Sequence, residues 1–172
     1  MRRIPPRTRV TVANRSSVHQ RVHLIKQAIQ FAVTDDPFTR YIGEKFRNDP
    51  NRLKQLYAYA CESARFEPDP DDSNGRALQS IRSPRALFRE RIGNCIDYSV
   101  FISSVLSLWR IPHVLRVSKL DHYGSLHIYP VLDNGIILDP VYCKDYLQEP
   151  DKANLCFNKE IPYISYTDYR II

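Results

Sequence analysis

Three residues that together could perform acyl transfer follow one another along this chain: Cys95, His127 and Asp139. A cysteine thiolate can attack a carbonyl carbon, a histidine can move the protons that the attack requires, and a carboxylate can fix the orientation of the histidine. Each residue alone has an ordinary structural explanation: cysteines pack in cores, histidines lie on strands, and Asp139 before Pro140 is a turn signal. Their common order predicts a nucleophile, a base and an orienting residue.

The cysteine lies where a loop is expected to become a helix. Gly93 and Asn94 precede it. Apolar residues at helical spacing then predict a helix over residues 95–109 with one apolar face, formed by Tyr98, Ile102, Val105 and Trp109. The unpaired amides and the dipole of a first helical turn favour a thiolate, so we expect Cys95 to be the nucleophile. Asp97 is expected to face solvent or to cap a local N–H group.

His127 and Asp139 are expected on neighbouring strands joined by a tight turn. The runs 126–132 and 135–141 flank the turn residues Asp133, Asn134 and Gly135. A two-residue turn would place Asp139 on the opposite face from His127, whereas a three-residue loop over 133–135 makes the two diagonal neighbours on one face. Gly135 suits the left-handed last position of a three-residue loop, so the sequence favours that register.

The remaining patterns predict helices first and strands afterwards. Helix starts are indicated by Ser17 with Gln20, Asp36-Pro37, Asp49-Pro50 and Ser83-Pro84, and Gly93 is expected to end the last of these helices. Strands are expected over 113–117, 126–132, 135–141 and 161–172, and residues 10–12 could pair as a further short strand. This order predicts an α+β fold in which an antiparallel sheet packs on the cysteine-bearing helix.

Within residues 80–142 the chain resembles the transglutaminase-like superfamily of papain-like cysteine enzymes. The ordered pieces that carry the resemblance are residues 93–97, a helix ending near Ile111 and Pro112, residues 127–129 and residues 137–140. The resemblance implies a papain-like α+β fold and a triad of Cys95, His127 and Asp139. The family usually has an acidic residue where Asn94 stands. Ser83-Pro84 is also similar to small phage-encoded members.

An acyl-transfer site needs donors for the oxyanion, and the backbone N–H of Cys95 is expected to be one. Gln79 is a candidate for the second, with Tyr57 and Tyr59 as rivals that also fit a helical core. We expect a cysteine peptidase or amidase acting on a protein or peptide without a cofactor. About thirty residues follow Asp139, which favours a shallow, water-accessible groove and hydrolysis. The alternatives are a protein-crosslinking transglutaminase and a structural or interaction protein, such as a virion component, that keeps the fold.

The length of 172 residues suits one domain. We expect a basic extended arm over 1–15 and a single domain over 16–172, with a helical layer at 16–66 and a catalytic core at 76–172. Residues 1–26 hold seven Lys/Arg and no Asp/Glu, which leaves 18 basic against 19 acidic residues in the rest of the chain. This segment suits an acidic protein partner or nucleic acid, with a solvated tail as the alternative.

No membrane span or secretory signal is expected, because the chain has no run of about eighteen apolar residues and no apolar stretch behind its basic start. We expect a cytoplasmic protein, or a virion-associated one if a phage encodes it. The four cysteines lack metal-site spacing and are expected to be reduced. No metal is expected either, because the acidic loop 67–75 lacks EF-hand spacing and His113 with His122 fits no common zinc pattern.

Overall fold

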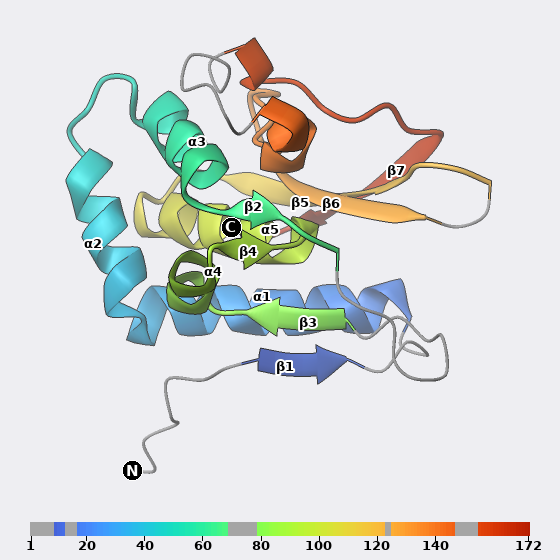
Figure 1. Cartoon of the computed structure of the whole chain (residues 1–172), viewed down its shortest axis with the longest axis horizontal. Helices are drawn as coiled ribbons and strands as arrows, with labels where there is room; N and C mark the ends of the chain where they lie inside the picture. The colour runs from blue at the N-terminus through green and yellow to red at the C-terminus, as the bar shows by residue number, and fades with distance from the viewer. Residues whose placement is uncertain (1–8, 13–16, 69–78, 123–124, 147–154) are drawn as a thin grey trace.

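The computed structural model describes residues 9–12, 17–68, 79–122, 125–146 and 155–172. Helices come first and an antiparallel sheet follows, so the expected α+β class is confirmed (Figure 1). The helices are α1 (Val18–Asp35), α2 (Pro37–Phe46), α3 (Arg52–Ser63), α4 (Pro84–Glu90), α5 (Cys95–Leu108) and the 3-10 helix η1 (Pro140–Tyr146). The strands are β1 (Arg9–Val12), β2 (Arg65–Phe66), β3 (Gln79–Arg82), β4 (Ile92–Gly93), β5 (His113–Lys119), β6 (Leu126–Leu132) and β7 (Ser165–Arg170).

Local capping signals fix most helix starts. Ser17 and Gln20 form the expected capping box of α1, and Asp36 caps α2 ahead of Pro37. Ser83 accepts a hydrogen bond from the Ala86 amide and caps α4 as expected. The Asp49-Pro50 prediction was wrong: α3 begins only at Arg52, since Asp49 instead accepts from the Asn51 amide at 2.7 Å and closes a turn.

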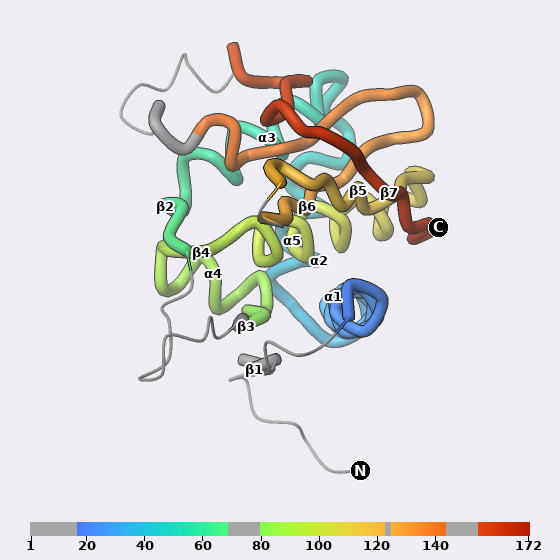
Figure 2. The backbone as a smooth tube through the Cα atoms, turned by 90° about the vertical axis from the view of Figure 1, so that its right-hand side faces the viewer, coloured from blue at the N-terminus to red at the C-terminus, as the bar shows by residue number. Residues whose placement is uncertain are grey.

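Helix α5 lies at the centre of the molecule, with α1 seen end-on beside it in Figure 2. The expected single apolar face is wrong, because every residue from Ile96 to Leu106 is buried. One core cluster joins α5 to α2, α3, α4 and η1. A second joins Ile96 and Val100 to α1 and the sheet, and Cys95 packs against both clusters. A helix that is surrounded in this way is buried on all sides, and its polar residues, such as Asp97 and Ser99, are buried too.

The sheet has the strand order β6-β5-β7, and both pairings are antiparallel. The C-terminal segment therefore closes the sheet as expected, through β7. The three-residue loop is confirmed: Leu132 N donates to Ile136 O, Val131 bridges Ile137, and Gly135 has φ 85°. The expected strand over 135–141 is wrong, because pairing is limited to that bridge and Pro140, which has no N–H, begins η1.

Two short pairings flank the cysteine turn. β1 pairs antiparallel with β3, and β2 pairs parallel with β4 (Figure 1). Gly93 lies in β4 and does not end α4; Arg91, with φ 57°, occupies the left-handed position. Gly93 is closely packed, since a Cβ there would lie 2.3 Å from Cδ1 of buried Leu87 and would force that side chain to shift.

The expectation of four reduced cysteines is wrong for two of them. Cys143 of η1 and Cys156 form a disulfide with a Cα–Cα distance of 5.7 Å, because the chain returns to η1 after residue 154. Cys61 and Cys95 are free. In the described part of the chain, no helix has the length and apolar character needed to cross a membrane.

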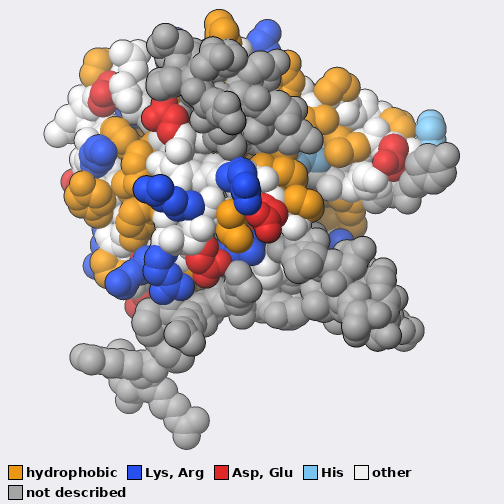
Figure 3. Space-filling model, in the orientation of Figure 1, with side chains coloured by type: hydrophobic (Ala, Val, Ile, Leu, Met, Phe, Trp, Pro, Cys, Tyr) orange, Lys and Arg blue, Asp and Glu red, His pale blue; other side chains and the backbone are white. Residues whose placement is uncertain are grey.

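The surface around α4 is charged. Figure 3 shows Lys and Arg side chains interspersed with acidic ones on the face that carries α2 and α4, and Arg65, Arg85, Arg89 and Arg91 are exposed there.

Residues 1–8 and 13–16 lie outside the described residues, as does most of the acidic loop 67–75. Binding of an acidic partner or nucleic acid through residues 1–26 therefore stays a prediction.

Candidate active site

Cys95 is the first residue of α5, and it is partly exposed. The side chain of Asn94 caps the helix by accepting hydrogen bonds from the amides of Ile96 at 2.9 Å and Asp97 at 3.2 Å. Among the described residues, none accepts a hydrogen bond from the amide of Cys95. The cap thus satisfies the two amides behind the cysteine, and within the described residues the first amide of the helix has no acceptor.

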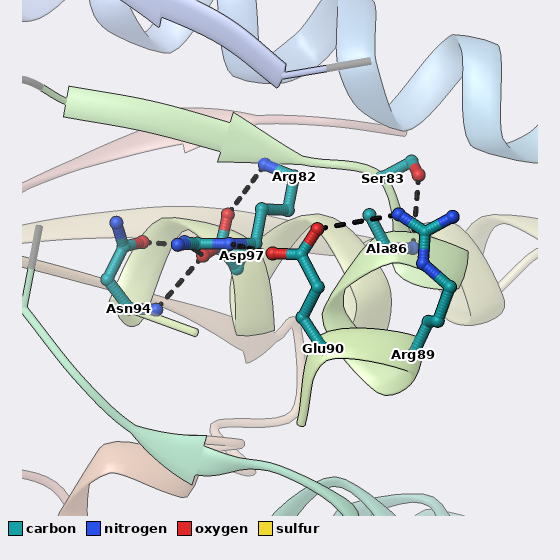
Figure 4. A network of polar contacts seen from close by, with 7 residues as sticks. All are labelled: Arg82, Ser83, Ala86, Arg89, Glu90, Asn94 and Asp97. Atoms are coloured by element: carbon teal, nitrogen blue, oxygen red, sulfur yellow. Dashed lines mark hydrogen bonds and ion pairs between the residues drawn. The ribbon is translucent and has the colours of Figure 1, made fainter. Parts of the chain in front are cut away.

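A buried network holds this turn in place. Asp97 is fully buried and accepts from the amide of Asn94 at 3.0 Å, the amide of Arg82 at 2.7 Å and the guanidinium of Arg82 at 2.6 Å. Figure 4 shows Arg82 reaching from β3 between Asp97 and Glu90 of α4. The capping role expected of Asp97 is confirmed and the solvent-facing alternative is wrong, because β3 and α4 cover the helix start.

His127 and Asp139 lie on one face of the hairpin and contact each other. Nε2 of His127 is 2.8 Å from Oδ2 of Asp139, and both side chains are nearly or fully inaccessible to solvent. Burial by itself lowers the pKa of His127, but the hydrogen bonds with Asp139 and Cys95, and the charges of both, raise that pKa to about 10. The site therefore favours an imidazolium.

Cys95 and His127 line the same space, and the sulfur contributes to the raised pKa of the ring. Because Asp139 engages Nε2, the other ring nitrogen, Nδ1, is left for the sulfur. The hydroxyl of Ser99 lies 2.7 Å from the carbonyl of Cys95 and 3.0 Å from the carbonyl of Ile128. Ser99 therefore joins the cysteine turn to the strand that carries His127.

Asp139 is fixed by contacts of its own. Its second carboxylate oxygen, Oδ1, accepts from the Val141 amide at 3.2 Å, at the start of η1. The hydroxyl of buried Tyr57 lies 3.1 Å from the carbonyl oxygen of Asp139 and 3.2 Å from that of Cys156. Helix α3 thus supports the backbone of the acidic residue, and the disulfide holds the same segment.

The oxyanion candidates have different positions. The backbone of Gln79 is paired with Val12 in the β1–β3 ribbon, and its side chain lies outside the described part of the structure. Tyr57 directs its hydroxyl at two backbone carbonyls, and Tyr59 packs against Phe46, Phe88 and Phe101. Both tyrosines therefore have the core roles that were expected as the alternative to oxyanion binding. Gln79 as the second oxyanion donor stays a prediction.

His113 and His122 have no group of metal-binding neighbours among the described residues. His113 is fully buried, with Nδ1 2.8 Å from the carbonyl oxygen of Ile111, and burial lowers its pKa. His122 is an exposed turn residue. Within the described residues, no three His, Cys, Asp or Glu side chains are grouped in a way that could hold a metal ion.

Some site residues could not be named from the sequence. Asn94 followed by Asp97 matches the spacing of a capping box, and that signal could have placed Asp97. Tyr57 and Ser99 gave no signal, because their partners lie 82 and 29 residues away. Arg21 of α1, which lines a cavity beside Cys95 and His127, gave none either.

Comparisons with known proteins add little to this geometry. No protein-family model matches the chain, and no curated protein matches it. One solved structure, a candidate cysteine protease from Cytophaga hutchinsonii, is similar at 14% sequence identity with a TM-score of 0.45. The similarity covers 61% of this chain and 37% of that one, so the chain spans well under half of that protein.

Proposed function

We propose that the protein is a cysteine hydrolase that cleaves a peptide or side-chain amide, with Cys95 as nucleophile, His127 as general base and acid, and Asp139 as the residue that orients His127. The observation that carries the proposal is the buried His127–Asp139 pair, which lines the same space as Cys95 at the start of a capped helix. A structural role for the hairpin would not require a charged pair at the cysteine.

The reaction begins with a thiolate–imidazolium pair. The sulfur of Cys95 attacks the carbonyl carbon, a C–S bond forms, and the carbonyl electron pair moves onto oxygen. The amide of Cys95, which no described residue accepts from, would donate to that oxyanion. His127 gives its proton to the leaving nitrogen, the C–N bond breaks, and a thioester remains.

Water completes the cycle. His127 takes a proton from water as the oxygen attacks the thioester carbonyl, and the C–S bond breaks to release the acid and the Cys95 thiolate. Asp139 keeps Nε2–H fixed, so Nδ1 faces the reacting atoms in both steps.

The nucleophile can be tested by alkylation with iodoacetamide at about pH 6. Cys95 is expected to react much faster than the second free thiol, Cys61, which is buried and whose pKa is raised by burial to about 12. His127→Ala should slow labelling of Cys95 and leave Cys61 unchanged. Equal rates at Cys95 and Cys61 would contradict the proposal.

The choice of water as acceptor needs a second assay. The protein is incubated with casein and a labelled primary amine, and peptide release and amine incorporation are followed together. Hydrolysis predicts release that is abolished in Cys95→Ser. Amine incorporation without release would instead identify a transferase.

A further inference from the structure

The ring of Tyr129 lies against the ring of His127. Both residues belong to β6, and their ring centroids are 5.0 Å apart with an angle of 33° between the ring planes. Tyr129 is 1% exposed and His127 is 4% exposed, so little solvent reaches the contact. A cation within about 6 Å of an aromatic ring centroid is attracted to the ring, and more strongly where water is excluded. Tyr129 is therefore placed to stabilise a protonated His127.

The hydroxyl of Tyr129 is bound to a carboxylate. It donates to Oε2 of Glu160 at 2.5 Å, a distance typical of a hydrogen bond to an ionised oxygen. Burial, and then the carboxylate of Glu160, raise the pKa of Tyr129, so the hydroxyl keeps its proton and remains the donor. A hydroxyl that donates to an anion is polarised, which leaves more negative charge on its ring. Glu160 thus strengthens the attraction between that ring and an imidazolium.

Arg116 of β5 attracts Glu160 but forms two hydrogen bonds with Asp168. Its Nε and Nη2 donate to the two carboxylate oxygens of Asp168 at 2.9 and 3.0 Å. Its Nη1 lies 3.7 Å from Oε2 of Glu160, which is within the range of an ion pair but too long for a hydrogen bond. The guanidinium therefore helps to hold Glu160 over the sheet, while the short hydrogen bond of that carboxylate is with Tyr129.

We propose that Tyr129 and Glu160 are positioning residues for His127. The ring of Tyr129 stabilises the imidazolium and fixes its plane, and Glu160 strengthens that contact through the Tyr129 hydroxyl. This role rests on the proposed function, in which the imidazolium forms an ion pair with the thiolate of Cys95. Glu160 lies between the disulfide and β7, so the C-terminal part of the chain contributes to the site.

The other charged groups around His127 are kept in the variants that test this role. Asp139 contacts Nε2 of the ring, and Cys95 of α5 and Arg21 of α1 line the same space as the ring. Asp139 and Cys95 raise the pKa of His127, against the lowering effect of burial. A change in the titration of His127 on altering Tyr129 or Glu160 therefore adds to these effects and does not replace them.

The titration of His127 tests the proposal directly. Carbon-13 labelling of the histidine rings lets NMR follow all five histidines from about pH 5 to 11, and His127→Gln identifies the signal of His127. Tyr129→Phe keeps the ring and removes the hydroxyl, and Glu160→Gln keeps an acceptor and removes the charge. Each variant is expected to lower the pKa of His127 by about half a unit or more, with the other four histidines unchanged.

A double variant shows whether Glu160 acts through Tyr129. If it does, Tyr129→Phe combined with Glu160→Gln lowers the pKa of His127 no further than Tyr129→Phe alone, because the link is already broken. Shifts that add in the double variant would overturn the route through the hydroxyl. If Tyr129→Phe does not fold, Glu160→Gln is compared with Glu44→Gln, which removes a negative charge from an exposed ion pair with Arg47 and should leave His127 unchanged.

Tyr98→Phe is the matched control for the loss of a buried hydroxyl. Tyr98 is 3% exposed, and its hydroxyl donates to the carbonyl of Ala64, so the variant loses a comparable hydrogen bond away from the imidazole. The titration of His127 should be unchanged in it. A shift in Tyr98→Phe as large as in Tyr129→Phe would overturn the proposal, since general loosening of the fold would explain both.

Iodoacetamide separates the two levels of failure. Fast, His127-dependent alkylation of Cys95 combined with an unchanged pKa of His127 in Tyr129→Phe and Glu160→Gln would overturn the positioning role and leave the nucleophile intact. Slow alkylation of Cys95 in the unchanged protein would remove the proposed function and this inference together.

Discussion

The hydroxyl of Tyr57 in α3 lies 3.1 Å from the backbone carbonyl oxygen of Asp139. Both residues are almost completely buried, and the same hydroxyl is 3.2 Å from the carbonyl of Cys156. An element from the first third of the chain thus supports the residue that orients His127. The contact couples helix packing to the geometry of the proposed triad.

Tyr57→Phe removes this hydroxyl and keeps the ring. The free energy of unfolding should fall by about 1–2 kcal/mol, because buried carbonyls lose their donor. kcat should fall and KM should change less, since Asp139 would be held less firmly. Urea denaturation and steady-state kinetics measure both. Tyr41→Phe, at a position that is 62% exposed, is the control and should change neither; equal effects of the two variants would refute the coupling.

Activity should depend on pH through His127. Its folded-state pKa of about 10 means that the imidazolium persists until strongly alkaline pH, so the alkaline limb of kcat/KM should lie near pH 10. Asp139→Asn removes the carboxylate that raises this pKa, so the limb should move to lower pH. An alkaline limb that is unchanged in Asp139→Asn would show that Asp139 does not act on His127.

Stability should respond to the same titration. The pKa of His127 in the folded state is above its ordinary value of 6.5, so the folded state holds the proton more tightly. The resulting stabilisation, at most about 5 kcal/mol, is complete below pH 6.5 and is lost as pH rises toward 10. Urea unfolding measured from pH 6 to 10 should show a decline in the free energy of unfolding that is smaller in His127→Gln than in the unchanged protein. Parallel curves for the two proteins would contradict this prediction.

Asp97→Asn should destabilise the protein strongly. The change weakens the buried contact with Arg82, and breaking a buried ion pair by removing one partner costs about 3–5 kcal/mol. The exposed pair formed by Asp133 and Arg170 provides the control, since Asp133→Asn should cost less than about 1 kcal/mol. Thermal unfolding measures the difference. If Asp97→Asn costs no more than Asp133→Asn, the network does not hold the cysteine turn.

Ser99→Ala should affect activity more than Ser104→Ala. Both hydroxyls contact the carbonyl four residues earlier in α5, but only Ser99 also contacts the carbonyl of Ile128 in β6. Loss of that link should slow alkylation of Cys95, because the sulfur and His127 are no longer joined through the helix turn. Similar alkylation rates in the two variants would show that only the contact of Ser99 within α5 matters, and that its contact with Ile128 does not support the site.

Several features of the site were determined by the sequence alone, because they depend on neighbouring residues. Asn94 before Cys95 set the start of α5, and the Asp133–Gly135 loop set the register that puts His127 and Asp139 on one face. Caps and turns follow from the hydrogen-bonding groups and backbone freedom of a few consecutive residues. These local signals could therefore be interpreted without knowledge of the rest of the fold.

Other features were decided only by the tertiary structure. The burial of Asp97 depends on Arg82 and α4. The backbone of Asp139 is supported by Tyr57, and part of the wall beside Cys95 is formed by α1. The disulfide depends on the return of the chain from Cys143 to Cys156, and the close packing of Gly93 depends on Leu87. Such contacts leave no periodic signal in the sequence, because their partners meet only when separate elements pack around α5.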